Sequence, residues 1–129
     1  MGGVLTASPI GIVLLALALV AARVSLTSAA TISADARNEA NTLMSDRCAV
    51  CHGDNGDGNG PGASNMNPGP QNFHDRNWQR GVSDATLVKA IIYGGAAVGV
   101  SASMPSNPDL AERPDVVGAL VEQIRVWGK

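Results

Sequence analysis

Two cysteines and a histidine stand close together at Cys48, Cys51 and His52, in the pattern Cys-x-x-Cys-His. Thiols separated by two residues in a helical turn can both form thioethers with the vinyl groups on one edge of a porphyrin. The histidine that follows directly puts an imidazole under the ring, where it can ligate iron. The pattern therefore predicts covalent attachment of one c-type haem, with His52 as an axial ligand.

Three other uses of a Cys-x-x-Cys pair fit this chain less well. A thioredoxin-like redox pair needs a βαβ context, and nothing before Cys48 has the pattern of a strand. A tetrahedral zinc site needs two more ligands, and the chain offers only His52, which adjoins its own cysteine pair, and His74. A disulfide across so short a ring would be strained and easily reduced.

A second axial ligand is expected from the segment 94–113, which has no clear periodicity although it is about twenty residues long. It contains Met104, and the following Pro105 disfavours a helical backbone at the methionine. Thioether ligation by Met104 would give His/Met coordination and raise the reduction potential. Of the competitors, Met66 is expected to pack on the ring and His74 to lie in a polar surface turn.

Three amphipathic helices are expected to position these residues. The first runs from about Ala34, capped by Ser33, to the cysteine motif. The second covers 84–93, after a Ser83 cap and before two glycines, and the third covers 114–127.

The glycine-rich run at 53–62 is not a calcium loop, because from Asp54 the alternate positions are Gly56 and Gly58 and the closing Glu is replaced by Asn65. It is not a dinucleotide-binding loop, because it follows a helix and no strand. We interpret it as a flexible wrap whose backbone passes close to a flat ligand. A haem-ligating histidine normally donates its other ring nitrogen to a carbonyl, and here a carbonyl near Pro61 or Pro68 is expected to accept.

The amino terminus carries an unbroken apolar run at 10–22, followed by small residues at 28–30. This is typical of a secretory signal, so residues 1–30 are predicted to be a signal peptide and 31–129 the mature domain. No Lys or Arg precedes the apolar run, which leaves an uncleaved membrane anchor through residues 4–22 as the alternative. Either arrangement predicts an exported, periplasmic domain.

The formal charge of the whole chain is −2, and it becomes −3 when residues 1–30, with Arg23 and no acid, are removed. No basic stripe is present that could neutralise phosphates, so nucleic acid is not expected as a partner. The sequence also shows no lysine-rich ring for docking an acidic protein.

The chain resembles a class I bacterial monohaem cytochrome c in the order of its motifs. These are Cys48-x-x-Cys51-His52-Gly53, Asn67-Pro68, Gly94-Gly95, Met104-Pro105 and a closing amphipathic helix. The resemblance covers about residues 34–128. It implies an all-α domain of three to four helices packed around one covalently attached haem.

The resemblance assigns the thioethers to Cys48 and Cys51 and the axial positions to His52 and Met104. It also implies that Trp78 lies near a haem propionate. The chain departs from the family at Gln123, where an aromatic residue is common, so the crossing of the terminal helices is expected to pack differently.

Together these features predict a one-electron carrier, not an enzyme, in an exported respiratory or photosynthetic chain. Its partners would be a redox protein donor and acceptor, and the domain would be a monomer. The alternatives are a haem subunit of a membrane-bound oxidoreductase, or a ligand-binding haem sensor if Met104 does not ligate iron.

Overall fold

The computed structural model describes residues 2–3 and 31–129. The chain divides into two compact units, Met1–Thr31 and Ile32–Lys129, and every element below belongs to the second. The predicted signal peptide or anchor, with its apolar run, lies outside the described residues except for 2–3, and it stays a prediction. Within the described part, no helix has the length and apolarity needed to cross a membrane.

The first helical segment runs without interruption from α2 (Ala34–Leu43) through a π-helical turn, η1 (Met44–Cys48), into α3 (Ala49–His52). Ser33 caps it as predicted, because its side chain accepts a hydrogen bond from the backbone N–H of Ala36. The π-helical turn was not predicted. It is the wide turn in which the Ala49 N–H reaches the Met44 carbonyl, and such turns are frequent at functional sites.

A short helix, α4 (Arg76–Gly81), occupies the region that we had expected to be a polar turn. Asp75 caps it by accepting from the N–H groups of Asn77, at 2.8 Å, and Trp78, at 3.1 Å. The next helix, α5 (Asp84–Tyr93), has the predicted bounds. Its Ser83 cap is confirmed, and Gly94 ends it with a φ of 84°, which favours glycine.

The expected loop at 94–113 contains two 3₁₀ segments, η2 (Gly95–Val98) and η3 (Pro108–Leu110). After it comes α6 (Pro114–Trp127), again with the predicted bounds, and with Pro114 in its first turn.

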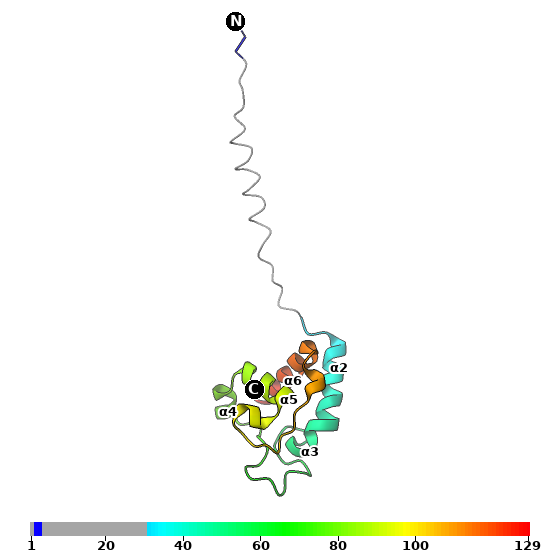
Figure 1. Ribbon diagram of the computed structural model, residues 1–129, viewed down its shortest axis with the longest axis vertical. Coiled ribbons are helices and arrows are strands. Elements are labelled where there is room, and N and C mark those ends of the chain that lie inside the picture. Colours follow the sequence, from blue (N-terminus) through cyan, green and yellow to red (C-terminus); the bar gives the residue numbers. More distant parts are fainter. Residues whose placement is uncertain (1, 4–30) are drawn as a thin grey trace. The chain divides into compact units, whose positions relative to one another are not determined.

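The core lies where α6 packs between α2 on one side and α5 on the other (Figure 1). Small residues of α2, Ala36 and Ala40, allow close packing of the two terminal helices. The largest fully buried side chains are Leu110, Val116, Val117 and Leu120. Because α3 continues α2, the domain has four main helices, and no strand occurs among residues 31–129. The prediction of an all-α domain of three to four helices is confirmed.

Candidate functional site

A cavity of about 320 Å³ brings together the two residues predicted to ligate iron, His52 and Met104. Most of its other lining residues are apolar: Met66, Pro68, Gly69, Pro70, Phe73, Trp78, Val82, Leu87, Ala90, Ile91, Val98, Val100 and Ile124. Gln71, Thr86, Ser101 and Ser103 complete the lining. A cavity with apolar walls and two potential iron ligands fits a haem.

The imidazole of His52 is held in one orientation. Its Nδ1 lies 3.0 Å from the Gln71 carbonyl oxygen. Because a carbonyl only accepts, Nδ1 carries the proton and Nε2 keeps the lone pair that a metal needs. The ring also stacks on Phe73, with centroids 4.5 Å apart and planes 15° from parallel.

Burial lowers the pKa of His52 below its ordinary value of 6.5, against the opposing effect of the hydrogen bond to Gln71. The imidazole is therefore neutral near neutral pH, which is the form that coordinates iron. The accepting carbonyl belongs to Gln71, which lies in the predicted loop, three residues after Pro68. The sequence indicated the segment that supplies the acceptor, and the structure identifies the residue.

The glycine-rich segment caps the carboxyl end of α3, a role that the sequence did not indicate. Its interpretation as a flexible wrap beside a flat ligand stays a prediction. The last three carbonyls of the helix each accept a hydrogen bond from a glycine N–H. These bonds join Gly62 to Val50 at 2.7 Å, Gly60 to Cys51 at 3.0 Å and Gly58 to His52 at 2.8 Å. A Cβ at Gly60 would collide with the Ala49 and Val50 carbonyl oxygens, so this close approach requires glycine.

The two cysteine thiols are free and half-buried. Cys48 ends η1 and Cys51 lies in α3, and neither belongs to the cavity lining. Burial raises the pKa of the Cys48 thiol above its ordinary value of 9.0, although the neighbouring Arg47 opposes the effect. Among residues 2–3 and 31–129, no group of three or more His, Cys, Asp or Glu side chains could hold a metal ion.

The Met104 loop is fixed to the end of α5. The Gly95 N–H donates to the Met104 carbonyl at 3.0 Å. Three residues further on, Asn107 donates its backbone N–H to the Ile92 carbonyl at 2.9 Å and its side-chain Nδ2 to the Ile91 carbonyl at 2.8 Å. Half-buried Met104 is therefore positioned at the cavity by backbone contacts that do not depend on a ligand.

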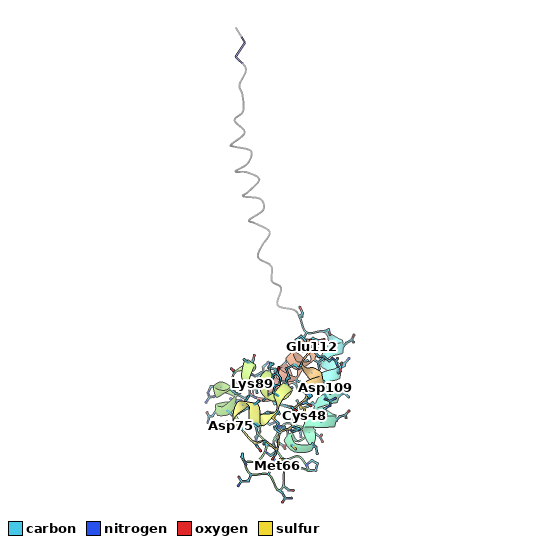
Figure 2. The ribbon with its side chains drawn as sticks, in the orientation of Figure 1. Cys48, Met66, Asp75, Lys89, Asp109 and Glu112 are labelled. Carbon is cyan, nitrogen blue, oxygen red and sulfur yellow. The ribbon has the colours of Figure 1, made fainter. Side chains whose placement is uncertain are left out.

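A salt bridge links η1, which carries Cys48, to η3, which follows the Met104 loop. Arg47, the residue before Cys48, contacts Asp109 at 2.8 Å, and both side chains are about half exposed. Figure 2 labels Cys48 and Asp109 on the same side of the domain. Nothing in the sequence indicates this contact, because the two residues are 62 positions apart.

Trp78 lines the cavity from α4. Its ring lies 5.7 Å from that of Phe73, which is the ring that stacks on His52. Gln79 fixes this aromatic wall, because its Nε2 donates to the carbonyls of Phe73 and Ile124, both at 2.8 Å. The structure thus places Trp78 at the cavity, as expected for a residue that contacts bound haem.

The two competing ligands lie in different places. Half-buried Met66, labelled in Figure 2, is part of the cavity lining, consistent with a packing role. His74 is exposed and is not part of the lining, and its Nε2 lies 2.8 Å from the Asn55 carbonyl. His74 therefore lies on the surface, as predicted.

The departure at Gln123 leaves a buried polar atom without a partner, its Oε1. The aromatic contact of this helix is made by Trp127 instead, which stacks on Phe73 with centroids 5.8 Å apart. Trp127 also lies against Gly56, where a Cβ would meet the indole ring.

Comparison with known proteins gives one family. A family model described as Cytochrome c matches residues 38–118, which is more than half of the chain. The match begins within α2, includes the Cys-x-x-Cys-His motif and Met104, and ends within α6. A search of curated proteins found no significant match.

Proposed function

The chain belongs to the cytochrome c family, and on that premise we propose that it is a one-electron carrier with one covalently attached haem c. Domains of this family transfer electrons by means of haem. The specific proposal for this chain is a six-coordinate carrier that exchanges electrons between a donor and an acceptor protein and has no substrate of its own.

The residues have distinct roles in this proposal. Cys48 and Cys51 would form the thioethers to the haem, and Nε2 of His52 and the thioether sulfur of Met104 would ligate its iron. Trp78 would contact a propionate. When bound, the haem supplies an iron that changes its oxidation state by one electron, and methionine ligation favours the reduced form.

The observation that carries the proposal is that His52 and Met104 line one apolar cavity and are each held there by backbone hydrogen bonds. Ligands that are already fixed rearrange little when the charge on the iron changes. Of the described residues that line the cavity, His52 is the only one with an ionisable acidic or basic side chain, and burial keeps it neutral. This lining favours electron transfer over acid–base catalysis.

We also propose that the domain works in the periplasm, in a respiratory or photosynthetic chain, as a monomer. The apolar run at 10–22 and the small residues at 28–30 support export. Attachment through residues 4–22 would instead make it a haem subunit of a membrane-bound oxidoreductase. Sequencing the amino terminus of the mature protein distinguishes the two, because cleavage near Ala30 releases a diffusible carrier.

The ligand assignment is tested with Met104→Ala, and with Met66→Ala as a control, because both methionines line the cavity. We expect Met104→Ala to keep the haem attached, to lose the weak far-red absorption band of methionine-ligated ferric haem, to lower the potential and to bind carbon monoxide. Met66→Ala should keep the band and stay indifferent to carbon monoxide. An unchanged band and potential in Met104→Ala would contradict the assignment.

A further inference from the structure

The positive charges of the domain are distributed unevenly. Four arginines form ion pairs with carboxylates: Arg37 with Glu122, Arg47 with Asp109, Arg113 with Glu39 and Arg125 with Asp84. Among residues 31–129, the other four cations, Arg76, Arg80, Lys89 and Lys129, form no such pair. Three of these four line a single open hollow, and only Lys89 lies outside it.

The hollow is formed by α4 and the carboxyl end of α6. Arg76 and Arg80 lie four residues apart, on the same face of α4, and Lys129 follows α6. Arg76 donates to the Lys129 backbone oxygen at 3.3 Å, which joins the two sides of the hollow. All three side chains belong to exposed residues. We call these three residues the α4 basic face.

The two acids that adjoin this face in the sequence, Asp75 and Asp84, form no ion pair with it. Asp75 caps α4 through two backbone N–H groups. Asp84 is paired with Arg125, and the same guanidinium donates to the Gln79 and Val82 carbonyls. Arg125 is therefore a structural residue in the hollow, whereas the α4 basic face keeps its charge available to a partner.

The α4 basic face lies beside the candidate haem site. The helix that carries Arg76 and Arg80 also carries Trp78, which lines the cavity. A partner on this face would be separated from the cavity by one short helix. The domain as a whole has an excess of acids, so a group of cations without ion pairs is the place where an acidic partner would be attracted.

We propose that the α4 basic face docks an acidic patch on a redox partner protein. The inference rests on the proposed electron-carrier function and names the chemistry of one partner. The sequence has no lysine-rich ring for docking an acidic protein, and two of the three cations of this face are arginines. Arg76 and Arg80, four residues apart on one helix, are its signal in the sequence.

The test uses the haem-loaded protein labelled with ¹⁵N, in its reduced form, titrated with a decaglutamate peptide at low ionic strength. Amide shifts are expected at 76–81 and 128–129. The double variant Arg76→Glu/Arg80→Glu should bind the peptide about tenfold more weakly, and the difference should vanish at high salt, where the charges are screened.

Lys89→Glu is the matched control, because it reverses an exposed charge outside the hollow, and its affinity should stay within about twofold of the wild type. Arg76→Gln/Arg80→Gln removes the charges without adding acids and should give an intermediate loss. An equal loss in Lys89→Glu, or shifts located elsewhere, would overturn the proposal. Binding to phosphatidylserine vesicles through this face, without binding to the peptide, would also overturn it in favour of a membrane surface.

The failure of this inference is distinguishable from the failure of the proposed function. An absorption spectrum of the same sample reports on the haem alone, whereas the peptide titration reports on the surface alone. A six-coordinate c-type spectrum without peptide binding at α4 would overturn only the docking surface.

Discussion

Replacing Gly60 by alanine should destabilise the domain, although Gly60 does not line the cavity. The backbone of Gly60 lies so close to the end of α3 that a Cβ would collide with the carbonyl oxygens of Ala49 and Val50. To relieve this collision, the glycine-rich segment must move away from the helix end. The movement would break the hydrogen bonds that cap α3, the end of the helical segment that carries both cysteines and His52.

The size of the effect follows from those bonds. Three of them join the segment to the last carbonyls of α3, and each contributes about 1 kcal/mol net, so their complete loss costs about 3 kcal/mol. Alanine also lowers the conformational entropy of the unfolded chain, which offsets about 1 kcal/mol of this loss. The net loss of about 2 kcal/mol corresponds to a melting temperature lowered by roughly 8–16 °C in a domain of this size.

The assay is thermal unfolding of the haem-loaded protein followed by circular dichroism. Gly81→Ala is the control, because a Cβ there meets no atom within 4 Å and the residue ends α4. Its stability should be unchanged or raised by up to about 1 kcal/mol, the helix-propensity difference between the two residues. If Gly60→Ala melts at the same temperature as Gly81→Ala, the capping role of the glycine-rich segment is refuted.

Three further predictions concern other contacts. Asn107→Ala removes the side-chain hydrogen bond to the Ile91 carbonyl, so we expect a loss of about 1 kcal/mol in urea unfolding. The looser Met104 loop should also allow some carbon monoxide binding, which the wild type lacks. Gln123→Leu removes a buried Oε1 that has no partner, and should raise the free energy of unfolding by about 1 kcal/mol; a decrease would mean that Oε1 is hydrogen-bonded. The hydrogen bond from Arg113 lowers the pKa of Glu39 below its ordinary value of 4.5, so the pair stabilises the fold above that pH and the stabilisation is lost as the pH falls through the folded-state pKa. Glu39→Gln should therefore show a smaller fall in melting temperature on acidification below 4.5 than the wild type.

The parts of the fold that could be predicted are those determined by local chemistry. Ser33 and Ser83 cap helices because a hydroxyl placed before an apolar stripe can satisfy a free N–H. Pro114 begins a helix and Gly94 ends one for equally local reasons. These signals located α5 and α6 at their observed bounds without any knowledge of tertiary contacts.

The features that were missed depend on contacts between distant segments or on elements too short to show a period. The π-helical turn at Met44–Cys48 lies between α2, which packs on α6, and α3, which carries the end of the motif. Such a turn changes which residues of the helix face the core, and the residue types alone do not indicate it. The helix Arg76–Gly81 has only six residues, although Asp75 is a good capping residue and could have indicated it.

The candidate site shows the same division. The Cys-x-x-Cys-His motif and the Met104-Pro105 pair predicted two iron ligands, and His52 and Met104 do line one cavity. The identity of the carbonyl that orients His52 could not be predicted, because Gln71 reaches the ring only through the path of the whole 53–73 segment. The glycines at every second position from 56 to 62 carried a usable signal. In the structure the glycines at 58, 60 and 62 donate to successive carbonyls at the end of α3, so the spacing of two matches one glycine to each carbonyl.

The most direct test of the central claim is the absorption spectrum of the exported, haem-loaded protein, recorded oxidised and reduced, with and without carbon monoxide. The account predicts a reduced c-type spectrum, a weak far-red band in the oxidised form and no response to carbon monoxide. Ready binding of carbon monoxide without the far-red band would mean that Met104 does not ligate iron and would favour a ligand-binding sensor. The absence of covalent haem would contradict the account at the residues on which it depends most, Cys48, Cys51 and His52.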